Sequence, residues 1–334
     1  MNTAGEDTPD YTGFFERARL SPVLVNATVL VGVLAIYLTV GSLATILVSG
    51  TDFSGFASSG GLEFRITDEN LQPIRLVQFL AQALILAVPV FFFVALHTGR
   101  RPLLSEENLS YLGLNSKASA LEYIYPIVAV LVSHPLLSYA GDLQLILLDA
   151  LFGNGDRLIE QQKIMEEFIG KLTLIRSPLE FIAVVGLVAV TPAICEELLF
   201  RGYIQKNFSR VLSPALTVVL TGLIFGFYHL NATETLPLCL LGIYISYLRR
   251  KSDALTVSMS VHFANNFFSV IGMFTAAHTE QFGLSPEIAD SINSGTPDIT
   301  SASAILSALL SLVLVSLATR MYKHEAEKRR GFQA

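Results

Sequence analysis

The chain has 334 residues, of which 52% are hydrophobic and 15% are charged. Ordinary soluble domains carry about 25% charged residues, so this composition excludes most classes of soluble protein. The formal net charge is −6, and no basic block of the kind that binds nucleic acid is present. We therefore expect a lipid bilayer, and no nucleic acid, around this chain.

Eight apolar stretches approach or exceed the roughly 20 residues that a helix needs to cross a bilayer. All should be helices, because a lipid-exposed backbone must satisfy its hydrogen bonds within the segment. In chain order they are 22–48, 76–96, 118–137, 179–200, 213–229, 235–248, 254–274 and 302–319. The sequence thus predicts an all-α polytopic membrane bundle of about eight transmembrane helices. It would comprise an N-terminal tail (1–21), one membrane domain (22–319) and a basic C-terminal tail (320–334).

Lys and Arg concentrate in alternate connections, whereas the connection 277–300 has neither. The positive-inside rule then places both termini in the cytoplasm. The connection 138–178 contains both charge signs, and its part 142–172 is amphipathic, so we expect it on the outer membrane surface.

Four residues inside or beside these stretches have ordinary structural explanations. We expect Glu122 to extend its carboxylate towards the inner interface and His97 to lie at an interface. Cys195 and Cys239 lie in apolar runs, so we predict small buried hydrophobes rather than a disulfide or a metal pair.

A pair of adjacent glutamates lies inside the fourth stretch, where ionisable residues are costly and are functional candidates. Glu197 and Arg201 are four residues apart, so they share one helix face and form a structural ion pair. Glu196 points about 100° away around the helix. It has no such partner and is a candidate general base.

The spacing of Glu196 and His229 predicts that they lie at one depth. They are 33 residues apart, and the midpoint falls immediately before Ser213, where Pro214 suits the first turn of a helix. Two antiparallel helices meeting there would each span about 24 Å. This hairpin requires the helix that contains Glu196 to continue to about Ser209.

His262 lies about 11 residues beyond the basic turn 249–251, roughly 15–17 Å along a helix. That distance permits a site shared with the hairpin. Asn266 follows His262 by one helical turn, so the two side chains face the same way.

The helix that ends near His229 has two further features. Phe225 precedes His229 by one turn and shares its face. Gly222 and Gly226 form a small-residue face that predicts close packing against a neighbouring helix.

These residues resemble the motifs of the CPBP intramembrane proteases. This family includes CAAX prenyl proteases of the Rce type and the bacteriocin-processing and immunity (Abi) proteins. The resemblance covers about 179–274, with Gly202 and Tyr203 also in their expected places. The three motifs, in order, are Glu196-Glu197-x-x-x-Arg201, Phe225-x-x-x-His229 and His262-x-x-x-Asn266.

The resemblance implies an intramembrane endopeptidase. Glu196 and His229 would activate water, and His262 and Asn266 would stabilise the oxyanion. Members are often called metalloproteases, and Glu196, His229 and His262 could hold zinc. A metal-free mechanism is equally compatible, and the helical His-Glu-x-x-His zinc pattern is absent.

The resemblance also implies a substrate class and a location. The substrate would be a membrane-anchored peptide or protein, prenylated in the eukaryotic relatives, and the location a prokaryotic plasma membrane. The alternative is a non-catalytic immunity or scaffold protein of the same fold, with a transporter as a third possibility. The presence of all four expected catalytic residues favours the enzyme.

Overall fold

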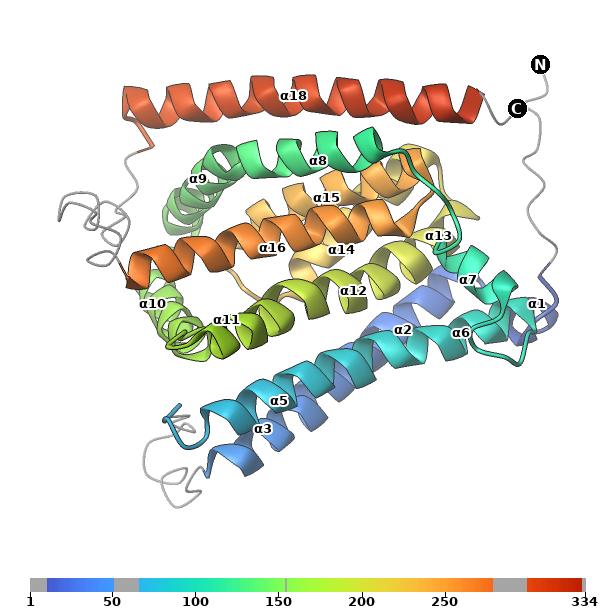
Figure 1. The fold of residues 1–334 in the computed structure, drawn as a ribbon, viewed down its shortest axis with the longest axis horizontal. Helices are drawn as coiled ribbons and strands as arrows, with labels where there is room; N and C mark the ends of the chain where they lie inside the picture. The colour runs from blue at the N-terminus through green and yellow to red at the C-terminus, as the bar shows by residue number, and fades with distance from the viewer. Residues whose placement is uncertain (1–10, 51–65, 154, 279–298, 332–334) are drawn as a thin grey trace.

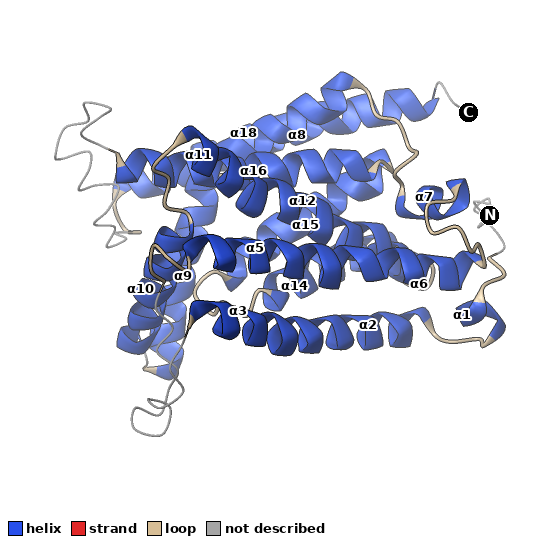
Figure 2. Cartoon of the chain, turned by 60° about the horizontal axis from the view of Figure 1, so that its bottom comes forward, coloured by secondary structure: helices blue, strands red, loops and turns tan. Residues whose placement is uncertain are grey.

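The structure is a computed structural model that describes residues 11–50, 66–153, 155–278 and 299–331 (Figure 1; Figure 2). Every secondary-structure element in these ranges is a helix, which confirms the predicted all-α fold. Three long helices contain wider π-helical turns, labelled η. These are α2 (Pro22–Ile36), η1 (Tyr37–Gly41) and α3 (Ser42–Ser49); α5 (Leu71–Ala81), η3 (Gln82–Ala87) and α6 (Val88–Thr98); and α11 (Pro178–Val185), η4 (Gly186–Val190), α12 (Thr191–Glu197), η5 (Leu198–Ile204) and α13 (Gln205–Ser209).

The remaining helices are single segments. They are α1 (Phe14–Arg17), α7 (Glu106–Leu112), α8 (Ala120–Val132), α9 (His134–Phe152), α10 (Gly155–Leu172), α14 (Pro214–Tyr228), α15 (Thr235–Ser252), α16 (Leu255–Ala277) and α18 (Ala302–Gly331).

Length and composition identify a multi-pass membrane protein. Within the described ranges, five helices are long and apolar enough to cross a bilayer. Their outer faces expose large apolar side chains such as Val31, Leu47 and Leu306, which a soluble protein would bury. The five are Pro22–Ser49, Leu71–Thr98, His134–Phe152, Pro178–Ser209 and Ala302–Gly331. Of the other predicted spans, 213–229, 235–248 and 254–274 coincide with α14, α15 and α16, so the count of eight and the orientation stay predictions.

The predicted third span, 118–137, is wrong in detail. The helix α8 ends at Val132, and α9 begins at His134 with Pro135 in its first turn. Proline has no backbone N–H and disfavours helical backbone before it, which explains the break. The connection 138–178 contains most of α9 and all of α10, and its expected place on the outer membrane surface stays a prediction.

The helices pack in layers around α15 and α16. Figure 1 shows α16 in the middle of the bundle, with α8 and α18 on one side and α12 on the other. Helix α16 contacts α8, α12, η4 and α15, and α12 also contacts η3. The three helices predicted to hold functional residues, α12, α14 and α16, therefore belong to one packed core.

The predicted close approach at Gly222 and Gly226 is confirmed. A Cβ added at Gly222 would overlap the backbone of Ile243, and one at Gly226 would overlap Cys239. Helices α14 and α15 therefore meet backbone to backbone, as small residues allow.

Two residues expected at a membrane interface are buried against other segments of the protein, and their depth in a membrane stays a prediction. Glu122 has no exposed area, and its Oε1 accepts a hydrogen bond from Arg329 at 2.7 Å. His97 is 1% exposed and lies 3.1 Å from the hydroxyl of Tyr203 and 3.0 Å from Glu16. Both residues are buried because distant segments supply polar partners that the local sequence does not reveal. Cys195 and Cys239 are free and buried, as predicted.

Candidate active site

The two adjacent glutamates lie at the end of α12, which is flanked by the π-helical turns η4 and η5. Such turns displace backbone carbonyls from the regular helical pattern and are frequent at functional sites. The helix continues to Ser209, and α14 begins at Pro214 after an N-cap by Ser213. The hairpin required by the spacing of Glu196 and His229 is therefore present.

The structure brings Glu196, His229 and His262 together. Oε2 of Glu196 lies 3.8 Å from Nε2 of His229 and 3.9 Å from Nε2 of His262. The Glu196 side chain is 16% exposed, and its Oε2 atom is buried without a hydrogen-bond partner. Both distances exceed a direct hydrogen bond, so the three polar atoms lie close together without being directly bonded.

The other ring nitrogen of each histidine has a different kind of partner. Nδ1 of His229 lies 2.8 Å from the carbonyl oxygen of Phe225. Because a carbonyl only accepts, this contact makes Nδ1 the donor and leaves Nε2 available. Nδ1 of His262 lies 2.9 Å from a carboxylate oxygen of Glu197 and donates to it. Each imidazole is therefore held with Nε2 towards Glu196.

The Glu197–Arg201 pair forms the buried support of this arrangement. Nη1 of Arg201 donates to Oε1 of Glu197 at 2.7 Å, and neither side chain has exposed area. Nη2 of the same guanidinium donates to the carbonyl of Gly242 at 3.0 Å, and Nε donates to Ser246 at 3.3 Å. The two charges are thus paired and hydrogen-bonded, as buried ions must be.

Phe225 is the apolar centre of the site and is 1% exposed. The guanidinium carbon of Arg201 lies 4.2 Å from the centroid of its ring, a cation–π contact. The ring also meets His229 and His262 edge to face, at centroid distances of 4.7 and 5.8 Å. One side chain therefore fixes the positions of three polar groups.

Asn266 lies on α16, one turn beyond His262, with its amide turned towards η4. Its Nδ2 donates to the carbonyl of Val188 at 3.0 Å, and its Oδ1 accepts from Asn265 at 3.1 Å. The carbonyl of Val188 belongs to a π-helical turn and is available to accept this bond. The hydrogen bonds of Asn266 thus anchor α16 to α11–α12.

The sequence predicts the pairing of Glu197 with Arg201. It does not predict the second partner of Glu197, which is His262. The two residues are 65 positions apart. No periodicity links them, although both lie in motifs of one site.

The same three side chains are the candidate ligands for a metal ion. Glu196, His229 and His262 supply the carboxylate and imidazole groups that zinc prefers. However, no group of three or more His, Cys, Asp or Glu side chains in the described part of the chain is positioned to hold an ion. The geometry therefore gives the metal alternative no support.

A comparison with protein families identifies this region. Residues 178–268 match the family model described as Rce1-like, type II CAAX prenyl endopeptidase Rce1-like. The matched range contains every residue of the three sequence motifs. No curated protein and no solved structure matches the chain.

Proposed function

Residues 178–268 form a domain of the Rce1-like type II CAAX prenyl endopeptidase family, and on this premise we propose that the chain hydrolyses a peptide bond of a membrane-associated protein or peptide. The observation that best supports the proposal is the convergence of two imidazole Nε2 atoms on Oε2 of Glu196. A carboxylate and imidazoles close together are the groups needed for general acid–base catalysis.

In the proposed first step, Glu196 takes a proton from a water molecule held between its carboxylate and Nε2 of His229. A water can bridge polar groups that are too far apart for a direct bond. The water oxygen forms a bond to the carbonyl carbon of the substrate, and the carbonyl oxygen becomes an oxyanion. Glu196 then gives its proton to the leaving nitrogen as the C–N bond breaks.

The two histidines receive different roles because their Nδ1 partners differ. The carbonyl of Phe225 is neutral, so His229 serves as a neutral imidazole whose Nε2 accepts from water. The carboxylate of Glu197 can stabilise positive charge on His262. His262 can therefore donate Nε2–H to the oxyanion.

Asn266 is proposed as the second oxyanion donor. Its amide nitrogen has two hydrogens, and the bond to Val188 uses one of them. The remaining N–H is available for the reacting oxygen. Such a donor contributes about 2.7–4 kcal/mol to transition-state stabilisation in other hydrolases.

The substrate is proposed to be a membrane-anchored chain, with a prenylated CAAX peptide as the first candidate because of the family description. The proposed location is the plasma membrane of a prokaryotic cell, with the basic ends of the helices in the cytoplasm. The competing function is a non-catalytic immunity or scaffold protein with the same fold, which the same experiment tests.

The experiment uses the full chain purified in detergent with a quenched peptide library that includes a farnesylated CAAX peptide. Wild type is compared with Glu196→Gln and His229→Ala, and with Glu234→Gln as a control. Glu234 is an exposed carboxylate at the N-terminus of α15. We expect both site variants to lose cleavage and the control to keep it. Cleavage that survives Glu196→Gln would contradict the mechanism, and absence of cleavage by wild type would favour the scaffold function.

A further inference from the structure

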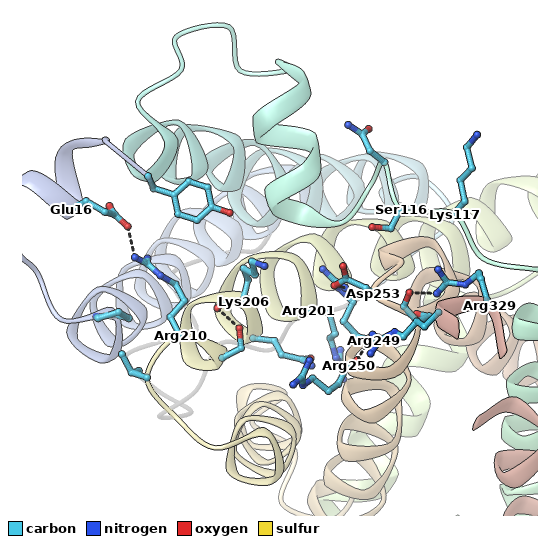
Figure 3. Close-up of a pocket in the computed structure, with 18 residues that line it drawn as sticks. Glu16, Ser116, Lys117, Arg201, Lys206, Arg210, Arg249, Arg250, Asp253 and Arg329 are labelled. Carbon is cyan, nitrogen blue, oxygen red and sulfur yellow. Dashed lines mark hydrogen bonds and ion pairs between the residues drawn. The ribbon is translucent and has the colours of Figure 1, made fainter. Parts of the chain in front are cut away.

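A cavity of about 1070 Å³ opens at the end of the bundle where the basic connections meet (Figure 3). It is lined by residues from five separate segments: 11–22, 115–117, 201–211, 249–253 and 329–330. None of Glu196, His229, His262 or Asn266 lines it. The cavity therefore lies apart from these four residues, and Arg201, which binds Glu197, is the lining residue that adjoins their site.

The lining carries an excess of positive charge. Eight of the lining side chains are Lys or Arg, and two are acidic. The acidic pair is neutralised locally, because Glu16 binds Arg210 at 2.7 Å and Asp253 binds Arg249 at 2.8 Å. Two further lining cations have acidic partners outside the lining, since Arg201 binds Glu197 and Arg329 binds Glu122. Figure 3 shows that these cationic side chains belong to different helices.

Arg249 is the buried anchor of this cavity. Its side chain is 6% exposed, and its Nε is buried without a hydrogen-bond partner. The guanidinium fits because Gly113, at a backbone φ of +76°, has no Cβ; a Cβ there would overlap it. The Nη2 atom donates to the carbonyl of Leu112 at 3.3 Å. The cationic guanidinium of Arg249 is thus held almost fully buried in the cavity wall, where an anion in the cavity would interact favourably with its charge.

The positive charge that is usual at the cytoplasmic ends of membrane helices does not account for a basic cavity. The positive-inside rule requires Lys and Arg near helix ends, but it does not require them to line a concave space of this size. Like charges gathered around a cavity repel one another, and bound counter-charge offsets that repulsion. The volume is slightly above the usual upper limit of about 1,000 Å³ for small-ligand sites.

We propose that this cavity binds a phosphate-bearing anion, carried either by the headgroup of an anionic phospholipid or by a free phosphate compound. The planar guanidinium of Arg matches phosphate oxygens in a bidentate manner. Basic pockets between transmembrane helices on the cytoplasmic side are known to receive anionic headgroups. No proposed catalytic residue lines the cavity, whereas Arg201, which supports the active site through Glu197, does.

The test measures ligand binding to the full chain in detergent by native mass spectrometry. The probes are phosphatidylglycerol, phosphatidylcholine with the same acyl chains, and inorganic pyrophosphate. The variant is Lys117→Gln with Arg250→Gln, two lining cations outside the catalytic machinery. The control, Arg101→Gln with Lys328→Gln, removes the same charge from exposed positions that do not line the cavity.

We expect phosphatidylglycerol or pyrophosphate to bind wild type and the control alike, and the variant about tenfold to thirtyfold more weakly. Competition between the two probes would show that lipid and free phosphate share the site. Binding of phosphatidylglycerol alone would assign it to the leaflet lipid, and binding of pyrophosphate alone to a soluble compound. The proposal is overturned if the variant binds as wild type does, if phosphatidylcholine binds equally well, or if no phosphate-bearing probe binds.

Discussion

Nδ1 of His262 lies 2.9 Å from Oε1 of Glu197, a carboxylate with no exposed area. The second glutamate of the pair therefore joins two functions. It neutralises Arg201 and it orients His262 towards Glu196. This geometry makes Glu197 a positioning residue whose loss should affect catalysis and folding together.

Glu197→Gln should lower kcat about 10- to 100-fold with little change in KM, because groups that orient a functional imidazole act at this scale. It should also lower the free energy of unfolding by about 3–5 kcal/mol, since Arg201 would remain buried without its counter-ion. Cleavage kinetics well below the melting temperature separate the two effects. An unchanged kcat in a folded variant would show that His262 does not depend on Glu197.

Arg201→Lys should destabilise the fold although the charge is kept. A lysine cannot reproduce the forked contacts with Glu197, Gly242 and Ser246, or lie flat over Phe225. Thermal unfolding can be followed with a thiol-reactive dye, because Cys195 and Cys239 are buried until the bundle opens. Arg101→Lys, at an exposed position, should leave the melting temperature unchanged. Equal melting temperatures for Arg201→Lys and Arg101→Lys would contradict a stabilising role for the forked guanidinium contacts.

Gly222→Ala should destabilise the α14–α15 contact by about 1–3 kcal/mol, the usual range for an overpacked core. The added Cβ would overlap backbone atoms of Ile243 that cannot move aside. Gly272→Ala is the matched control, because no atom lies within 4 Å of its added Cβ. That control should be neutral or slightly stabilising, as alanine favours helix. The comparison is made by thermal unfolding in one detergent.

Asn266→Ala should reduce kcat about 10²- to 10³-fold, the loss seen when one oxyanion donor is removed. KM should change little, because the proposed contact forms with the reacting oxygen. Ser269→Ala, on the exposed side of the next turn, controls for effects of truncating α16. A variant with normal kcat and reduced stability would instead assign Asn266 to anchoring α16 through Val188.

Cleavage should persist after treatment with a zinc chelator. The reason is geometric, since no described group of His, Cys, Asp or Glu side chains is positioned to hold an ion. The measurement compares activity before treatment, after treatment and after zinc is added back. Loss of activity that zinc restores would contradict this prediction and assign Glu196, His229 and His262 to a metal.

The sequence predicted the parts of the site that depend on helical periodicity. The turn at Ser213-Pro214 and equal arm lengths indicated that Glu196 and His229 share one depth, and the structure has this hairpin. The close helix packing at Gly222 could also be predicted, because small residues spaced one turn apart in apolar helices usually mark a helix–helix contact.

Features that depend on contacts between distant segments could not be predicted. Glu122 has local surroundings typical of an interfacial carboxylate, and only the folded chain brings Arg329 to it. The break between α8 and α9 is caused by one proline inside an otherwise apolar run, and hydrophobicity alone does not reveal it. The partnership of Glu197 with His262 likewise depends on the packing of α12 against α16.

The buried pair of Glu122 and Arg329 has a consequence for biosynthesis. The two residues are 207 positions apart, so a ribosome adding about 5–20 residues per second needs roughly 10–40 s to make the second after the first. During that interval the Glu122 carboxylate lacks the guanidinium with which it pairs in the folded chain. The contact between α8 and α18 can therefore form only at the last stage of synthesis.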